Sequence, residues 1–239
     1  MAEISAEHRR QMEDGTTIIA ELDVALAMIH TGLAALGARP RNLDAAMQQL
    51  APGYERFLKL TYILAQAHLQ GARPEWKALK AHSHDLLGLL DALFEAVAQA
   101  DGYASRPIVV EDLNFMREDK SMRALIEVLS HFGAYGRYAR LDDLVKDDRV
   151  GADGEPSRRW EEIEQELVWA RPDSEEIAES MDLLPPATFE VRASLTRLAR
   201  ALGRMWVFGA LGAEGTAHLG ALSEFTRLDD EELGAELAG

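Results

Sequence analysis

The chain has 239 residues, a formal net charge of −16 and no cysteine. This length suits one large domain or one and a half, because domains usually hold ~100–150 residues. Without cysteine there are no disulfides, thiol nucleophiles, iron–sulfur clusters or thiolate zinc sites, and any metal would need histidine and carboxylate ligands. The N-terminal stretch MAEISAEHRRQMEDG lacks the apolar region of a signal peptide, and no run approaches the ~20 apolar residues of a membrane span. We therefore expect a cytoplasmic protein that does not enter a membrane.

The negative charge is concentrated in two segments. Residues 142–182 hold fifteen acidic against five basic side chains, and residues 224–239 hold six against one. Nonspecific binding to phosphate backbones draws on clustered lysine and arginine, so this composition argues against a broad nucleic-acid surface. A small basic pocket that makes a local contact with RNA is still compatible with it.

Apolar residues recur at helical spacing almost throughout, and no run of alternating β-branched residues marks a strand, which predicts an all-α protein. The first helix is expected over 16–36. The second is expected over 43–69, with an interruption at APG (51–53), and it should end at Gly71. A third element begins with WKALK and continues as a helix over 83–99.

The second half follows the same pattern. A loop, DGYASRPIVVED, precedes a helix near 120–132 that closes in FGAYGRY, where two glycines suit a helix end. An acidic helical hairpin is also expected. Its first helix covers 157–169, the chain breaks at Pro172, and a short second helix follows. The last long helix should cover 187–210. The division into domains is then a helical bundle over 1–150, the hairpin and long helix packing on it over 151–225, and an acidic tail over 226–239 that frays.

The stretch KAHSHDLLGLL carries His82, His84 and Asp85 at the start of an apolar helix. Imidazole beside carboxylate can hold a metal or perform acid–base chemistry. The same residues can simply begin a helix, since Ser83 or Asp85 can cap its exposed N–H groups. The residue types favour the helix start. A His-Asp dipeptide on a helix also resembles the HD-domain phosphohydrolases, which implies a metal site at His84 and Asp85 as a less favoured alternative.

Three segments together resemble the HEPN-like superfamily. They are GYERFLKLTYILA with Glu55 and Lys59, KAHSHDLLGLL with His84 and Asp85, and the aromatic-Gly-Arg-Tyr stretch that ends at Tyr138, within about residues 15–145. The superfamily includes toxins of toxin–antitoxin modules and proteins of phage-abortive infection. The resemblance implies a bundle of four or five helices that forms a homodimer in a prokaryotic cell. In active members it implies a metal-independent ribonuclease with an Arg followed four to six residues later by a His.

That ribonuclease motif does not occur in this chain, because seven residues separate Arg123 from His131, the nearest pair in this order. The reversed pair, His131 and Arg137, brackets two glycines and is the candidate catalytic pair. The aromatic side chains around it, Tyr138 among them, are interpreted as packing rather than as a platform for stacking bases.

Glu55 lies four residues before Lys59, the favourable orientation for an ion pair on a helix. If that helix face points at His84 and Asp85, the side chains form a polar cluster, with Tyr138 as a further member. Such a cluster is either a ligand site or a hydrogen-bond network that fixes helix register.

Arg197, Arg200 and Arg204 form a stripe on the last long helix. They suit either a phosphate-binding strip or ion pairs with the acidic hairpin of 161–179, and the hairpin is the favoured partner.

From these observations we expect a non-catalytic interaction or ligand-binding component, in a defence or toxin–antitoxin setting that the resemblance alone implies. The alternatives are a divergent ribonuclease using Arg137 and His131, a metal phosphohydrolase using His84 and Asp85, or an acidic protein whose charged hairpin binds a basic surface of a partner. No cofactor is expected. The expected partners are a second copy of the chain, another protein or a small ligand.

Overall fold

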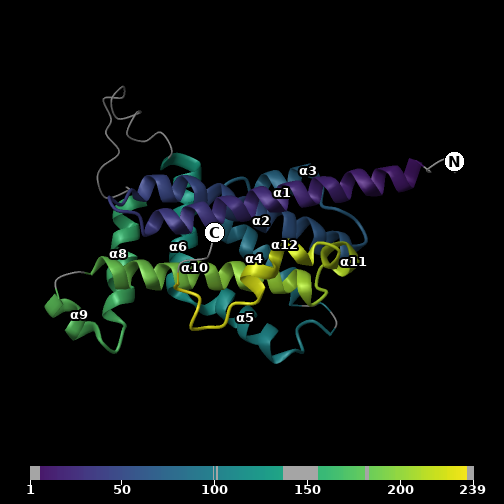
Figure 1. The fold of residues 1–239 in the computed structure, drawn as a ribbon. Coiled ribbons are helices and arrows are strands. Elements are labelled where there is room, and N and C mark those ends of the chain that lie inside the picture. Colours follow the sequence, from purple (N-terminus) through teal and green to yellow (C-terminus); the bar gives the residue numbers. More distant parts are fainter. Residues whose placement is uncertain (1–5, 99, 101, 137–155, 181–182, 236–239) are drawn as a thin grey trace, which may run out of the picture.

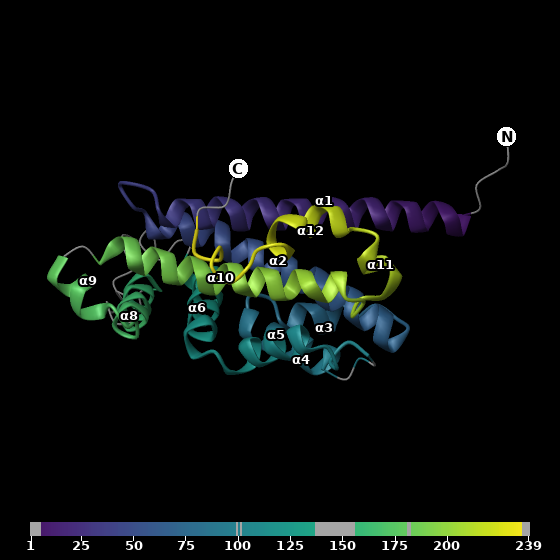
Figure 2. The ribbon, with the colours of Figure 1, turned by 60° about the horizontal axis from the view of Figure 1, so that its bottom comes forward.

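The computed structural model describes residues 6–98, 100, 102–136, 156–180 and 183–235. Within these ranges the chain is an all-α helical bundle with no strand, as the sequence predicts. Figures 1 and 2 show the long helices α1, α2 and α10 lying along one another, with α6 and α8 running across them. The elements are α1 (Ala6–Leu36), α2 (Leu43–Gln70), α3 (Trp76–Ala81), α4 (Leu86–Val97), α5 (Pro107–Glu118), α6 (Lys120–His131), the π-helical turn η1 (Phe132–Gly136), α8 (Pro156–Trp169), α9 (Ser174–Ser180), α10 (Leu184–Val207), α11 (Gly212–Thr216) and α12 (Leu219–Thr226).

Helices α1 and α2 form a long hairpin. Helix α2 runs through Pro52 without a break, so the interruption expected at APG was wrong, and it ends at Gly71 in the left-handed conformation, with φ of 73°. Two glycines lie where the helices meet. A Cβ built on Gly32 would lie 2.5 Å from Leu50 Cγ, and one built on Gly53 would lie 3.1 Å from the backbone nitrogen of Ile29. The two helices can therefore approach closely because neither glycine carries a side chain.

Replacing Gly32 by alanine should lower the free energy of unfolding by about 1–3 kcal/mol, because the added methyl group overpacks the contact with Leu50. Gly15, on the same helix, is the matched control, since nothing lies within 4 Å of its Cβ position. Gly15→Ala should raise the free energy of unfolding by about 0.5–1 kcal/mol through higher helix propensity. Urea denaturation measures both, and an equal effect of the two changes would contradict the close packing.

Helix α10 lies in the core rather than on its surface. Its side chains at Leu195, Leu202 and Trp206 are fully buried and belong to one cluster with the buried residues of α1, α2, α4, α5 and α6. Two hydrogen bonds tie it to α2: the Tyr54 hydroxyl donates to the Leu195 carbonyl at 2.7 Å, and Trp206 Nε1 donates to Thr61 Oγ1 at 3.0 Å. The segments predicted as 1–150 and 151–225 thus share one hydrophobic core.

Three segments differ from what the sequence predicts. The loop expected before residue 120 contains helix α5, which begins at Pro107 because proline suits the first helical position. Helices α11 and α12 follow α10, where none was predicted. The segment after α12 does not fray over its described part, 227–235, because Leu233 is buried and Arg200 contacts Leu228 and Asp230. We call residues 227–235 the C-terminal strap.

One helix is long and apolar enough to cross a membrane by length and composition, over Glu13–Leu36 of α1. Core helices of soluble proteins share these properties. One face of this helix, including Leu22, Ile29 and Leu36, is buried in the bundle core.

Candidate functional site

Glu55, Lys59 and His84 come together on one side of α2. Glu55 and Lys59 occupy successive turns of the helix, and Lys59 Nζ donates to Glu55 Oε1 at 2.5 Å. The other carboxylate oxygen, Oε2, lies 3.0 Å from Nδ1 of His84. The Glu55 side chain is only 18% exposed, so one largely buried carboxylate orients both nitrogen-bearing groups.

The turn between α3 and α4 carries His84 to this position. Asp85 is the N-cap of α4, where its Oδ1 accepts from the Gly88 amide at 2.9 Å. The Leu86 amide donates to Ser130 Oγ at 2.9 Å, which fixes the same turn against α6. Gly133 of η1 lies against the imidazole, with a Cβ position 3.8 Å from His84 Nδ1. His84 is thereby held between α2 and η1.

A groove of about 480 Å³ opens beside this cluster. Glu55, Lys59 and His84 line it together with an ion pair across the α1–α2 hairpin, between Glu21 and Arg56. Three apolar side chains complete the lining: Pro52, Leu60 and Ile63. The groove is therefore lined by two carboxylates, a lysine, an arginine, a histidine and three apolar side chains.

The remaining predicted site residues do not join the groove. Asp85 is exposed and serves as a helix cap, which is the structural role the sequence favours. His131 is exposed at the end of α6, and its ring lies 5.5 Å from that of Tyr135. Arg137 and Tyr138 lie outside the described residues.

Within the described ranges, no group of three or more His, Cys, Asp or Glu residues is arranged to hold a metal ion. His84 is hydrogen-bonded to Glu55, and Asp85 to the start of α4. The geometry around these two side chains therefore gives the metal phosphohydrolase interpretation no support.

Sequence reasoning did not find Glu21 and Arg56. Arg56 directly follows Glu55, but only the register of α1 against α2 brings Glu21 to it. That register depends on contacts such as those of Gly32 and Gly53, which no periodicity in the sequence reveals.

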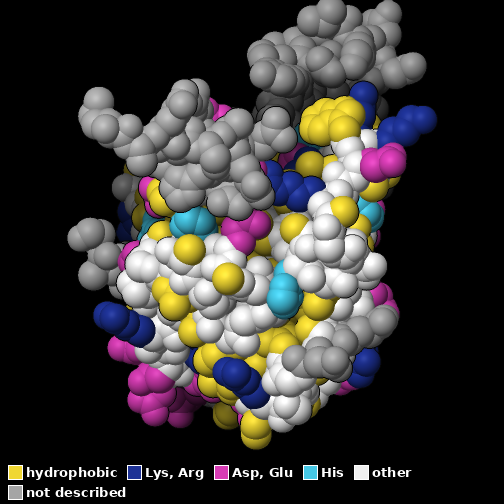
Figure 3. All heavy atoms as spheres, turned by 90° about the vertical axis from the view of Figure 1, so that its right-hand side faces the viewer, with side chains coloured by type: hydrophobic (Ala, Val, Ile, Leu, Met, Phe, Trp, Pro, Cys, Tyr) yellow, Lys and Arg dark blue, Asp and Glu magenta, His cyan; other side chains and the backbone are white. Residues whose placement is uncertain are grey.

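Figure 3 shows the molecule from the right-hand side of Figure 1, at the end where α11 lies. Hydrophobic and uncharged atoms cover the middle of this face, while lysine and arginine side chains are scattered over it singly. The described residues of this face therefore do not form the continuous basic surface that tracks a phosphate backbone.

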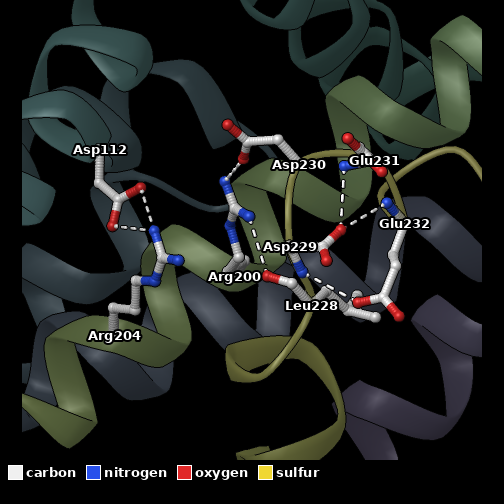
Figure 4. A network of polar contacts seen from close by, with 8 residues as sticks. All are labelled: Asp112, Arg200, Arg204, Leu228, Asp229, Asp230, Glu231 and Glu232. Carbon is white, nitrogen blue, oxygen red and sulfur yellow. Dashed lines mark hydrogen bonds and ion pairs between the residues drawn. The ribbon is translucent and has the colours of Figure 1, made fainter.

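A second polar network surrounds the arginine stripe of α10, and its main parts are drawn in Figure 4. Arg204 Nη1 donates to both carboxylate oxygens of the buried Asp112, at 3.0 and 3.2 Å. Arg200 donates to the Leu228 carbonyl at 3.0 Å and to Asp230 Oδ1 at 2.5 Å. The guanidinium of Arg197 lies over the ring of Phe115, 4.3 Å from its centroid.

The carboxylates around this stripe are not those that the sequence indicated. Arg200 and Arg204 pair with Asp230 and Asp112, which belong to the C-terminal strap and to α5, and not with the acidic hairpin of 161–179. Burial raises the pKa of Asp112, and the three arginines act in the opposite direction. Asp230 lies at the surface, where the hydrogen bond from Arg200 lowers the pKa of its carboxyl group.

The Asp230 contact should respond to acid. Because its pKa is lowered on folding, the stabilisation from this contact is present above the pKa of an unfolded aspartate, ~3.9, and is lost as the pH falls through the folded value. A carboxyl-carbon NMR titration should therefore find Asp230 titrating below an ordinary aspartate. Titration at or above the ordinary value would show that Arg200 does not hold this carboxylate in solution.

Comparisons of the chain with protein-family models, with curated proteins and with solved structures found no match.

Proposed function

We propose that the chain is a HEPN-like helical protein that binds a small polar ligand in the groove beside Glu55, Lys59 and His84, without catalysing a reaction. The observation that carries the proposal is the largely buried Glu55 carboxylate, which orients Lys59 and His84 at the wall of a groove of about 480 Å³. Grooves of this volume are large enough for small molecules, and a few convergent polar groups in them fix the ligand's orientation.

The lining indicates the chemistry of the ligand. Lys59 carries three N–H donors, one of which is used by Glu55, and Arg56 adds a guanidinium at the rim. Glu21 and Glu55 supply acceptors on the same wall. A ligand that carries both an anionic oxygen and a hydrogen-bond donor, such as an amino acid or a nucleotide, is complementary to this arrangement.

Lys59→Met tests the proposal, because it removes the cation at the centre of the wall and keeps an aliphatic chain of similar length. Loss of the ion pair with Glu55 costs only ~0.2–0.5 kcal/mol, so the variant should fold. A ligand found by thermal shift against a panel of amino acids and nucleoside monophosphates should bind it at least about tenfold more weakly, as expected for a lost charged hydrogen bond.

Lys80→Met is the matched control, because Lys80 is exposed on α3 and does not line the groove. Its affinity for the same ligand should equal that of the wild-type protein. Equal binding by the wild-type protein and both variants would contradict a site at this groove, and so would the absence of any ligand from the whole panel.

Homodimer formation and a role in prokaryotic defence belong to the same proposal and rest on the resemblance to the HEPN-like superfamily. The divergent ribonuclease stays a prediction. Of its two residues, His131 is exposed at the end of α6, and Arg137 lies outside the described residues.

A further inference from the structure

The arginine stripe of α10 gathers more positive charge than the carboxylates beside it neutralise. Arg197, Arg200 and Arg204 lie on one face of the helix, and Asp112 and Asp230 are the acidic groups that they contact or influence. The Arg200 side chain is only 4% exposed. Arg200 pairs with Asp230 and Arg204 with Asp112, so the half-buried Arg197 has no carboxylate contact among the described residues. An anion would balance this remaining positive charge.

Unused hydrogen-bond donors lie in the same place. Nε of Arg200, Nε of Arg197 and the hydroxyl of Tyr103 are buried and have no hydrogen-bond partner among the described residues. A buried donor without an acceptor destabilises the fold, and more so when the group is charged, so three such donors in one network favour the binding of an acceptor. Tyr103 belongs to this network, since Asp112 and Arg204 both influence its pKa.

The acidic partner of Arg200 comes from the C-terminal strap, at a position where an external anion could take its place. Asp230 contributes its carboxylate from the surface, with its side chain 79% exposed, while Arg200 beneath it is buried. Figure 4 shows the strap passing over Arg200, with Asp229 turned back toward the amides of Glu231 and Glu232. An exposed carboxylate that contacts a buried guanidinium occupies the position that an external oxyanion would take.

We propose that Arg200, flanked by Arg197 and Arg204, is an oxyanion-binding site that takes a phosphate group in place of Asp230. The C-terminal strap then acts as a built-in competitor: its carboxylate holds the site, and a ligand must displace it to bind. Phosphate is the class that fits best, because its oxygens can accept from several guanidinium groups at once, including the Nε donors that Asp230 leaves unused.

Binding of inorganic phosphate to the full-length protein tests this proposal, measured by isothermal titration calorimetry at constant ionic strength. Asp230→Ala removes the competing carboxylate and should bind phosphate at least about tenfold more tightly than the wild-type protein, the effect of freeing one charged hydrogen bond. Glu231→Ala is the matched control: it removes the same charge from the next position of the strap, where the exposed side chain makes no described contact, and it should bind as the wild type does.

Two further binding measurements test where the phosphate binds and which anion the site prefers. Arg197→Lys in the Asp230→Ala background should weaken phosphate binding and leave the affinity of the groove for its own ligand unchanged, which separates this site from the groove of the proposed function. Acetate in place of phosphate should bind more weakly if a phosphate rather than a carboxylate is the ligand. Equal phosphate affinity in the wild-type, Asp230→Ala and Glu231→Ala proteins would overturn the proposal, as would binding that Arg197→Lys leaves unchanged.

Discussion

Truncating Asp112 to alanine should lower the free energy of unfolding by about 3–5 kcal/mol, one of the two largest effects that we expect from a single substitution in this chain. Asp112 is 1% exposed and is the acceptor for Arg204, whose side chain is itself only 11% exposed. Burial raises the pKa of Asp112, so the pair stabilises the fold less than its geometry suggests. The loss on truncation comes instead from leaving Arg204 charged, buried and without its acceptor.

Chemical denaturation of Asp112→Ala measures this loss, and its neighbour provides the control. Glu111 is exposed on the same turn of α5, so Glu111→Ala should change the free energy of unfolding by no more than about 0.5 kcal/mol. The double variant Asp112→Leu with Arg204→Met should be more stable than Asp112→Ala alone, because no buried charge is left unpaired. If Asp112→Ala were as stable as Glu111→Ala, the ion pair would not be formed in solution.

Trp206→Ala should lower the free energy of unfolding by a similar amount, about 3–5 kcal/mol, because it removes the largest kind of side chain from the centre of the core. Trp206 is fully buried in α10, packs against Phe57 with ring centroids 6.4 Å apart, and donates to Thr61. The substitution leaves a cavity between α10 and α2 and removes the hydrogen bond that the Thr61 hydroxyl accepts, although this hydroxyl still donates to the Phe57 carbonyl.

Trp76→Ala is the control for this change, since Trp76 on α3 is 73% exposed. The same truncation there should alter the free energy of unfolding by no more than about 0.5 kcal/mol. Urea denaturation followed by circular dichroism, rather than by tryptophan fluorescence, compares the two variants without losing the signal. Similar losses of the free energy of unfolding in Trp206→Ala and Trp76→Ala would mean that α10 is not a core helix.

The sequence predicts most of the helices because their apolar spacing and their ends are local properties. Helix α2 ends at Gly71, and α6 and α8 lie within a residue of their predicted bounds. Helix α5 was missed because its first turn, Pro-Ile-Val-Val, contains three β-branched residues after a proline and looks like the end of a loop. Its start depends on proline at the first helical position, which is favourable there and nowhere else in a helix.

The candidate sites were harder to predict from the sequence, because their residues come from segments that are far apart in the chain. Glu55 and Lys59 could be paired from their spacing, and His84 could be placed opposite them only on the condition that their helix face points at it. The partners of the arginine stripe, Asp112 and Asp230, lie 92 and 30 residues from the arginines that they contact. Only the packing of α5 and of the strap against α10 selects them over the many other acidic residues of this chain.

The burial of α10 also affects how the chain folds during its synthesis. The ribosome completes α1 to α6 well before it reaches α10, which fills the space among them. Until then the apolar surfaces of these earlier helices stay uncovered. Contacts such as that of Tyr54 with Leu195 close a loop of 141 residues, which makes the final step slow compared with the local formation of each helix. The nascent chain therefore keeps apolar surface exposed, and stays prone to aggregation, until α10 has been translated.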